Sequence, residues 1–394
     1  MLYISKREIE RRISEITDRM SRKGIDALYL VSPSNIAYTT NFFHIPTERP
    51  IAALILASGE SILFVPRLEL EHAERYSYAD SVLSYREYPD ERHPMSVIVD
   101  QMRGLGLEGK RIGFDGDGHG HAYGYRGPRL SELLSASYSY ERDLVEDLRM
   151  IKSEEEITLL RESAKWAGYA HRLLQEYITV GRIEDEVSLL ASMEATLAMA
   201  KTLKDIYRPL GWFSGASAGF RGQVGEHSYY PHSLTVHAVI RRGDVLVTGA
   251  TANVSGYCSE LERTLVVGSP SPEQERFFKL MMGARSVALG MVRAGVRCSD
   301  VDRAVRKFFE ENGLNEHWRH HTGHGIGLDF HEAPFLDVGY ERTLEEGMVI
   351  SVEPGIYVRG LGGFRHSDTI LVTSDGFEFI THYPDQLEDL IVEG

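Results

Sequence analysis

The stretch LRMIKSEEEI, residues 148–157, most constrains the fold because the pattern of the chain changes there. Before it, short apolar runs alternate with helical segments, and after it the helical patterns become long. Ser153 and Glu156 form a capping box, a signature of a helix start. A chain of 394 residues is also longer than one domain usually is. We therefore predict two domains, residues 1–150 and 151–394.

The first third of the chain alternates helix and strand patterns. Ser5 and Glu8 resemble a capping box, and four apolar residues then recur at helical spacing before Gly24. Apolar runs bounded by turn residues predict strands at 26–31, 51–57, 61–66 and 111–115. This alternation predicts an α/β fold class.

Composition excludes several classes of partner. The formal net charge of −15 argues against nucleic acid and anionic membranes. No apolar run approaches the roughly 18 residues of a membrane span, so we expect no membrane association. The N-terminal residues have no apolar segment typical of a signal peptide, and the two cysteines exclude a disulfide framework. We therefore predict a cytoplasmic location.

Ionisable residues gather in four stretches of the second domain, each beside glycine or proline and close to an apolar strand. Buried ionisable groups are costly unless they are paired, so such groups are candidates for function. In GYCSELERT, Glu260 and Glu262 lie two residues apart on a predicted strand and share a face. Their repulsion calls for a metal ion, a cationic substrate or a shared proton. The stretches are YYPHS (229–233), GYCSELERT (256–264), HHTGHGIGLDFHEAP (320–334) and the pair ISVEPGIYV (350–358) with GGFRHSD (362–368).

These strings resemble the superfamily of methionine aminopeptidase, prolidase and creatinase, which has the pita-bread fold. The resemblance covers nearly the whole chain, including the MIKSEEEI entry into the second domain. It implies a creatinase-type N-terminal domain with a mixed sheet, followed by a pita-bread catalytic domain.

Metal-dependent members of the superfamily share five ligands, two aspartates, one histidine and two glutamates, around two ions. The corresponding positions here are Gly249, Glu260, His324, Glu353 and Ser367. Two ions about 3.5 Å apart need shared carboxylates, which glycine and serine do not supply. We therefore expect no dinuclear centre and no cofactor. A single divalent ion held by Glu260, His324 and Glu353 is the alternative, since one nitrogen and two oxygens suit zinc or manganese.

The string GYCSELERT is similar to the corresponding strand of creatinase, the metal-free member. The similarity implies a hydrolase that cleaves a C–N bond in a small guanidino, amidino or amide substrate. His232 would act as acid and base, and Glu262 and Glu353 would bind the substrate nitrogens. A planar guanidinium bonds carboxylates in bidentate fashion, and imidazoles transfer protons near neutral pH, so this chemistry needs no metal.

The resemblance also implies further substrate-binding residues and a partner. Arg49 falls where the family places an arginine that reaches the partner subunit's site, which implies a homodimer. The predicted substrate-binding residues are Arg49, Glu260, His324, His331, Tyr257, Arg365 and His366.

Two alternatives remain open. The string GHGIGLDFHEAP is prolidase-like and favours an Xaa-Pro dipeptidase or aminopeptidase with a mononuclear metal site. The loss of two ligand positions is also compatible with a non-catalytic binding member of the superfamily.

Overall fold

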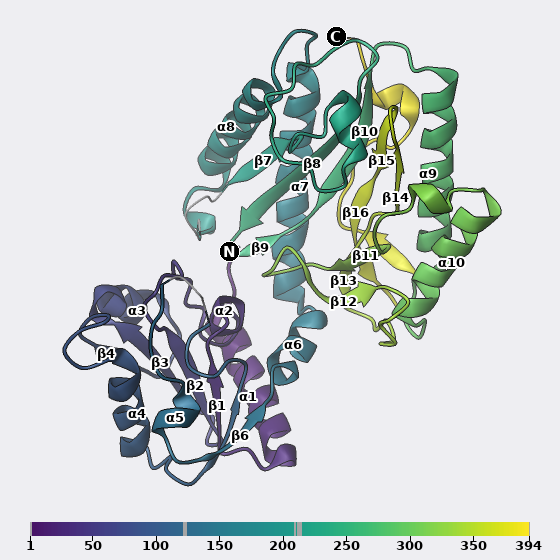
Figure 1. Cartoon of the computed structure of the whole chain (residues 1–394). Coiled ribbons are helices and arrows are strands. Elements are labelled where there is room, and N and C mark those ends of the chain that lie inside the picture. The colour runs from purple at the N-terminus through teal and green to yellow at the C-terminus, as the bar shows by residue number, and fades with distance from the viewer. Residues whose placement is uncertain (1, 121–123, 209, 211–214, 394) are drawn as a thin grey trace. The chain divides into compact units, whose positions relative to one another are not determined.

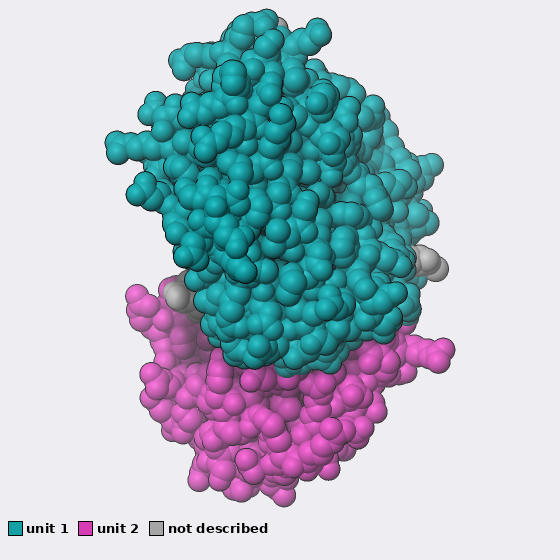
Figure 2. All heavy atoms as spheres, turned by 90° about the vertical axis from the view of Figure 1, so that its right-hand side faces the viewer, with its two compact units in different colours: residues 1–3, 150–394 teal, residues 4–149 magenta. Residues whose placement is uncertain are grey.

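The computed structural model describes residues 2–120, 124–208, 210 and 215–393. Two compact units make up the chain (Figures 1 and 2). One comprises residues 4–149 and the other residues 1–3 with 150–394. Both combine helices with a sheet, which confirms the predicted α/β class.

The N-terminal unit is built on a six-stranded mixed sheet in the order β4-β3-β2-β1-β5-β6 (Figure 1). The pairs β1·β2 and β2·β3 are antiparallel and the other three pairs are parallel. The strands are β1 Ala27–Leu30, β2 Ala52–Leu56, β3 Ser61–Pro66, β4 Ser81–Tyr85, β5 Arg111–Phe114 and β6 Ser137–Tyr140. The helices are α1 Lys6–Lys23, α2 Pro33–Thr40, α3 Leu70–Tyr76, α4 Pro94–Gly104, α5 Leu130–Leu133 and α6 Asp143–Met150.

Helix α1 begins and ends as its sequence predicts, with one difference. The Ser5 hydroxyl accepts a hydrogen bond from the Glu8 amide, and Gly24 ends the helix in the left-handed conformation. A capping box would also have the Glu8 carboxylate accept a hydrogen bond from the Ser5 amide. Here that carboxylate accepts hydrogen bonds from Arg11 and Arg12 instead. A charged donor competes well with a backbone amide for a carboxylate.

The second unit contains a ten-stranded sheet with the central order β12-β11-β13-β16-β10-β8-β7, to which β9, β17 and β18 add (Figure 1). Strands β14 and β15 form a separate hairpin. The strands are β7 Ala216–Gly219, β8 Val245–Val254, β9 Tyr257–Cys258, β10 Leu261–Val267, β11 Gly323–Gly325, β12 Glu332–Leu336, β13 Val349–Val352, β14 Gly355–Val358, β15 Gly362–Arg365, β16 Ser367–Val372, β17 Phe377–Phe379 and β18 Ile391–Val392.

Four long helices pack against this sheet. Helices α7 (Glu154–Tyr177) and α8 (Glu184–Leu203) contact each other; α7 also contacts strands β7 and β8, and α8 contacts β7. Helices α9 (Pro272–Met291) and α10 (Cys298–Glu311) pair with each other, and α9 contacts β13 and the β14–β15 hairpin (Figure 1). Helix α7 starts with a complete capping box, since Ser153 and Glu156 bond each other's backbone amides through their side chains.

A buried polar layer ties β10 to β16. Asp368 accepts hydrogen bonds from Arg263 at 2.8 Å and from Arg285 at 2.6 Å, and all three side chains are buried. His171 lies in the same layer, where its Nε2 donates to the Thr248 hydroxyl at 2.6 Å. The Thr248 hydroxyl itself donates to the Arg263 carbonyl, so the imidazole must be the donor of that pair.

Stability is expected to fall as the pH drops from 7.5 to 5.0, because His171 must be neutral in the folded chain. Burial, assisted by the charge of Arg263, lowers the pKa of His171 to about 3. An unfolded histidine titrates near 6.5, so the unfolded chain binds more protons below that pH. The neutral imidazole therefore makes its full contribution to the free energy of unfolding above pH 6.5. Acidification to pH 5.0 lowers that free energy by about 2 kcal/mol. His366, whose pKa burial lowers strongly, acts in the same direction.

Urea unfolding at the two pH values measures this loss. His171→Gln is expected to reduce the difference between the two pH values by about 2 kcal/mol. The control His227→Gln, which removes an exposed histidine, leaves it unchanged. An equal pH dependence in wild type and His171→Gln would contradict the assignment.

Candidate active site

The register of three neighbouring strands brings the acidic residues together. Glu262 on β10 pairs directly with Gly249 on β8 and with Ser367 on β16. Glu260 precedes it by two residues, and Glu353 follows the end of β13. Carboxylate oxygens of Glu260, Glu262 and Glu353 all lie within 4.8 Å of one another, and the three residues are buried. The structure therefore places three carboxylates in one confined space, where they need positive charge or protons.

His324 on β11 adds an imidazole to this cluster. Its Nε2 atom lies 3.2 Å from Glu353 Oε1 and 3.7 Å from Glu260 Oε2. The His331 ring stacks on the His324 ring with centroids 3.6 Å apart, and ligand atoms of Glu260, His324 and His331 lie within 4.8 Å of one another. Within the described residues the buried Nε2 atom of His324 has no hydrogen-bond partner, although Glu353 Oε1 lies 3.2 Å away. An orphaned buried nitrogen among carboxylates is the arrangement expected of a metal ligand.

Burial and mutual charge set the protonation of the cluster. Burial and the charges of Glu353 and Glu262 raise the pKa of Glu260 to about 8. Burial opposes charge on His324, but the contacts with Glu353 and Glu260 prevail and raise its pKa to about 9. Burial likewise opposes charge on Glu353, yet His324 lowers its pKa to about 2. The three groups compete for protons, and a divalent cation would take the place of those protons.

Glu262 differs from the other two glutamates because arginines neutralise it. Arg365 on β15 binds it with two nitrogens, Nε to Oε2 and Nη2 to Oε1, the latter at 2.7 Å. Arg221 donates from Nη2 to the same Oε1 atom at 2.8 Å. A carboxylate held by two guanidinium groups has little capacity left for a substrate cation or a metal ion. The expectation that Glu262 binds substrate nitrogens therefore does not match its surroundings.

Arg365 continues the network away from Glu262. Its Nη1 donates to the Tyr357 hydroxyl at 2.8 Å and to the Pro231 carbonyl at 3.2 Å. The Tyr357 hydroxyl lies 2.8 Å from His320 Nε2, whose other ring nitrogen bonds the His321 carbonyl. Burial lowers the pKa of His320, so Nε2 of the neutral ring accepts a hydrogen bond from the tyrosine hydroxyl. Arg365 thereby fixes Pro231, the residue before His232.

Three residues of this network escaped the sequence analysis. Tyr357 and His320 lie inside strings already singled out there, and the available signal for Tyr357 was its position three residues after Pro354 in the same string. Arg221 lies in none of the four strings, and its role depends on the pairing of β7 with β8.

Two predicted site residues, His232 and His331, lie outside the buried acidic cluster and are exposed. His232 is exposed and close enough to His331 to affect its titration. Burial and the charge of His324 lower the pKa of His331 to about 4, and His232 adds to this effect. These two imidazoles face the solvent-accessible side of the cluster.

Tyr257, His366 and Arg49 are not brought into the cluster. The Tyr257 hydroxyl donates to Glu156 of α7. His366, which lies between β15 and β16, is fully buried with its ring edge-on to Phe278. Arg49 belongs to the N-terminal unit, where its guanidinium binds Glu48 and Glu87.

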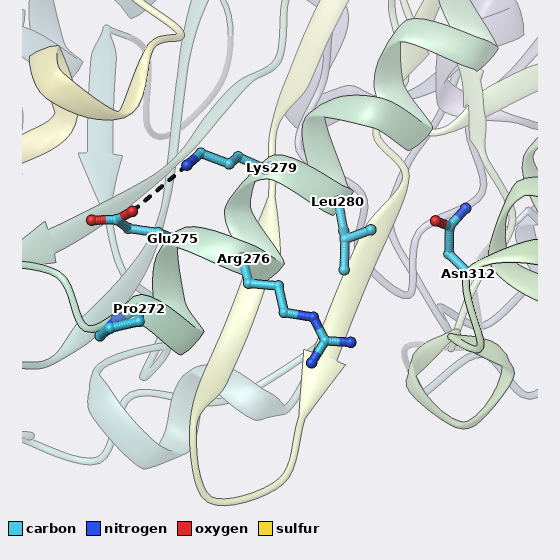
Figure 3. A pocket seen from close by; sticks show the side chains of 6 residues that line it. All are labelled: Pro272, Glu275, Arg276, Lys279, Leu280 and Asn312. Atoms are coloured by element: carbon cyan, nitrogen blue, oxygen red, sulfur yellow. Dashed lines mark ion pairs between the residues drawn. The ribbon is translucent and has the colours of Figure 1, made fainter.

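A cavity of about 640 Å³ opens onto the acidic cluster. This volume suits a small ligand. Its lining comes from α8, β7, β8, β10 and adjoining loops, and includes Leu189, Arg221, Thr251, Glu260, Glu262 and Phe330. A second cavity, of about 510 Å³, lies along the outer side of α9, with Glu275 and Lys279 paired at its edge (Figure 3). It includes no member of the acidic cluster, so the first cavity is the candidate active site.

Comparison with known proteins identifies two matching family models. Residues 158–374 match the model described as metallopeptidase family M24. Residues 12–151 match the model of the creatinase/prolidase N-terminal domain. An uncharacterized peptidase of Staphylococcus aureus is 29% identical over 373 residues, which cover 94% of this chain and 99% of the relative.

Solved structures give the same result. The Xaa-Pro dipeptidase from Bacillus anthracis is 29% identical with a TM-score of 0.80, and the match covers 97% of this chain and 99% of that one. The prolidase from Pyrococcus horikoshii is 27% identical with a TM-score of 0.78, covering 96% and 99%. A dipeptidase from Mycobacterium ulcerans is 25% identical with a TM-score of 0.83 over the full length of both chains. The predicted resemblance and the pita-bread fold are confirmed.

Proposed function

The chain belongs to metallopeptidase family M24, and on that premise we propose that it is a metal-dependent peptidase acting on short peptides, with Xaa-Pro dipeptides as the leading substrate class. The observation that carries this proposal is the full-length similarity to an Xaa-Pro dipeptidase together with the convergence of Glu260, His324 and Glu353. These residues are the carboxylates and the imidazole that a hydrolytic metal site uses.

The creatinase-like interpretation is wrong. The relatives and solved structures that the chain matches over nearly its full length are peptidases, Xaa-Pro dipeptidases and prolidases. The string GYCSELERT suggested a guanidinium-binding glutamate, but Arg365 and Arg221 of the chain itself already bind Glu262. The guanidinium groups that bind Glu262 thus belong to the protein itself and not to a substrate.

The expectation of a metal-independent enzyme with no cofactor is also wrong, because the family is one of metallopeptidases. The donor set fits one divalent ion, held by Glu260, His324 and Glu353. Gly249 supplies no ligand, and the Ser367 hydroxyl is committed to Glu260 Oε1 at 2.6 Å. When bound, such an ion polarises the scissile carbonyl and makes water a better nucleophile at neutral pH.

The side chains around the cluster suit the remaining tasks of amide hydrolysis. His232 and His331 are exposed imidazoles beside it. The lowered pKa of His331 leaves its ring neutral near pH 7, so His232 is the residue that we assign to give a proton to the leaving nitrogen. The Arg365–Tyr357–His320 network holds the Pro231 carbonyl and thereby the backbone before His232. The cavity above the cluster has room for a dipeptide.

A homodimer remains part of the proposal. Helix α8 exposes Leu189, Met193 and Leu197, with 69%, 57% and 52% of their surfaces accessible, at intervals of four residues that align them on one face. A second copy of the chain would cover such an apolar stripe. No described helix is both long enough and apolar enough to cross a membrane, and the cytoplasmic location stays a prediction.

Hydrolysis assays with defined metal content test the proposed function. Protein stripped with a chelator is expected to lose at least about 100-fold in kcat/KM for alanyl-proline, because the Lewis acid contributes several kcal/mol. Manganese or zinc is expected to restore activity at one equivalent, with elemental analysis reporting one bound ion per chain. Full turnover without metal, or failure to cleave any Xaa-Pro dipeptide when loaded, would refute the proposal.

A further inference from the structure

Glu184, the first residue of α8, is a buried carboxylate outside the acidic cluster, with only 1% of its surface exposed. Its Oε2 atom accepts a hydrogen bond from the Gly222 amide at 2.6 Å. Its Oε1 atom accepts from the amides of Val236 at 2.8 Å and Ala238 at 3.2 Å. One buried side chain therefore joins the turn after β7 to the loop that carries His232. Hydrogen bonds to a carboxylate are roughly twice as strong as those between neutral groups.

The loop that carries His232 has little structure of its own. Residues 232–238 form neither helix nor strand, and His232 is exposed. The Leu234 side chain is 81% exposed, so the loop does not bury its apolar residue in a core. The position of such a segment depends on the hydrogen bonds that its backbone makes to the rest of the fold.

The backbone of this loop is held on both sides of His232. On one side, the Pro231 carbonyl accepts hydrogen bonds from Arg365 at 3.2 Å and from Gln223 at 3.3 Å. On the other side, Glu184 binds two amides of the loop, and its own amide donates to the Ala238 carbonyl at 2.9 Å. His232 thus lies between two anchors, of which Glu184 is the second.

The turn after β7 supports the middle of the loop. Gly222 has φ of 76°, and a Cβ atom there would lie 1.9 Å from the Leu234 carbonyl oxygen. The two backbones are therefore in direct contact, which a residue with a side chain would not permit. Because Glu184 binds the Gly222 amide as well as the loop, it fixes the two segments relative to each other.

We propose that Glu184 is a positioning residue for His232, which it holds at the open side of the acidic cluster through the backbone of residues 236–238. This inference rests on the proposed peptidase function, in which His232 gives a proton to the leaving nitrogen. Proton transfer needs the imidazole within hydrogen-bond reach of that nitrogen. A displacement of about 1 Å costs up to about 100-fold in rate.

The Glu184→Gln variant tests the proposal in the full-length, metal-loaded enzyme. The amide has the same shape but only one acceptor oxygen, so it can bind one of the two segments and not both. We expect kcat/KM for alanyl-proline to fall by about 10- to 100-fold, mainly through kcat, because proton transfer belongs to the chemical step.

A double-mutant cycle with His232→Gln shows whether Glu184 acts through His232. His232→Gln alone is expected to lose at least about 100-fold in kcat/KM. Adding Glu184→Gln to it is expected to change kcat/KM by less than about threefold, because the imidazole that Glu184 positions is already absent. A general effect on the fold would lower activity by the same factor in both backgrounds.

A matched control lies on the same turn of α8. Glu186→Gln removes an exposed carboxylate that pairs with Arg182, and it is expected to leave activity unchanged. Thermal unfolding and elemental analysis show that each variant is folded and loaded. Glu184→Asp keeps the charge but is one methylene shorter, so it also reaches only one segment and enters the same cycle in place of Glu184→Gln if the latter does not fold.

The possible outcomes separate this inference from the peptidase function. Equal losses with and without His232 would show that Glu184 supports the fold only, and would overturn the inference. Wild-type kcat/KM in Glu184→Gln would overturn it too, while leaving the peptidase function intact. Failure of the loaded wild type to cleave any Xaa-Pro dipeptide would overturn both.

Discussion

The His324→Ala variant is expected to lose at least about 10³-fold in kcat/KM for alanyl-proline, together with its bound metal ion. His324 supplies the only imidazole nitrogen within the proposed ligand set, and its Nε2 atom lies between the carboxylates of Glu353 and Glu260. Removing it leaves two buried carboxylates to repel each other without a nitrogen ligand. Steady-state kinetics and elemental analysis of the same preparation measure the two losses.

A matched control and a folding check accompany this variant. His227→Gln, at an exposed position, is expected to keep both metal and activity. A thermal unfolding curve shows whether His324→Ala remains folded without metal. If the folded variant retained a full equivalent of metal and wild-type turnover, His324 would not be a ligand and the proposed site would be incorrect.

The Arg365→Met variant is expected to lower the free energy of unfolding by about 3 to 5 kcal/mol, the usual cost of leaving one member of a buried ion pair alone. Arg365 binds Glu262 in bidentate fashion, and both side chains are almost fully buried. Arg221 compensates only in part, because half of its side chain is in solvent. Urea unfolding measures the change.

A double-mutant cycle tests whether the loss comes from the unpaired charge. Glu262→Gln combined with Arg365→Met is expected to recover most of the stability, since a neutral amide replaces the isolated carboxylate. Arg241→Met, at an exposed position, provides the control for the removal of an arginine. Losses that simply add in the double variant would show that Arg365 stabilises through Tyr357 and Pro231 and not through Glu262.

Local sequence signals were sufficient for the fold class and for part of the site. The capping box at Ser153 depends on residues three positions apart, so its geometry follows from the sequence alone. His324 lies between two glycines, Glu353 precedes a proline, and Glu260 lies two residues before Glu262 on a predicted strand; the structure brings the three together. The capping box depends on residues close together in the sequence, and the three site residues were identified from strings that resemble those of a known superfamily.

The partners of Glu262 were beyond such reasoning because they are distant in sequence. Arg221 and Arg365 lie 41 and 103 residues away, and they reach Glu262 through the arrangement of β7, β15 and β10. The string GYCSELERT indicated that Glu262 needs a cationic partner, but it did not show that two arginines of the chain fill that role. That omission allowed a guanidinium substrate to be inferred where the chain provides its own guanidinium groups.

His366 shows a second limit. Its neighbour Ser367 hydrogen-bonds Glu260, yet His366 itself packs against Phe278 with a strongly lowered pKa. His366 lies in the link between β15 and β16, whereas Ser367 begins β16 and pairs with Glu262 of β10. The sequence alone did not show which of these two neighbours would reach the acidic cluster.

The placement of Glu262 between Gly249 and Ser367 has a consequence for how such a site can change. A Cβ atom at position 249 would lie 3.5 Å from Glu262 Oε1, so a carboxylate introduced there meets one already in place. An aspartate at 249 would add a negative charge beside Glu262, and loss of Glu262 would leave Arg221 and Arg365 without the carboxylate that they share. A change between the arginine-filled and the carboxylate-rich arrangement therefore involves Gly249, Glu262 and Arg365, which lie on three different strands, because each replacement alters the charge that the others face.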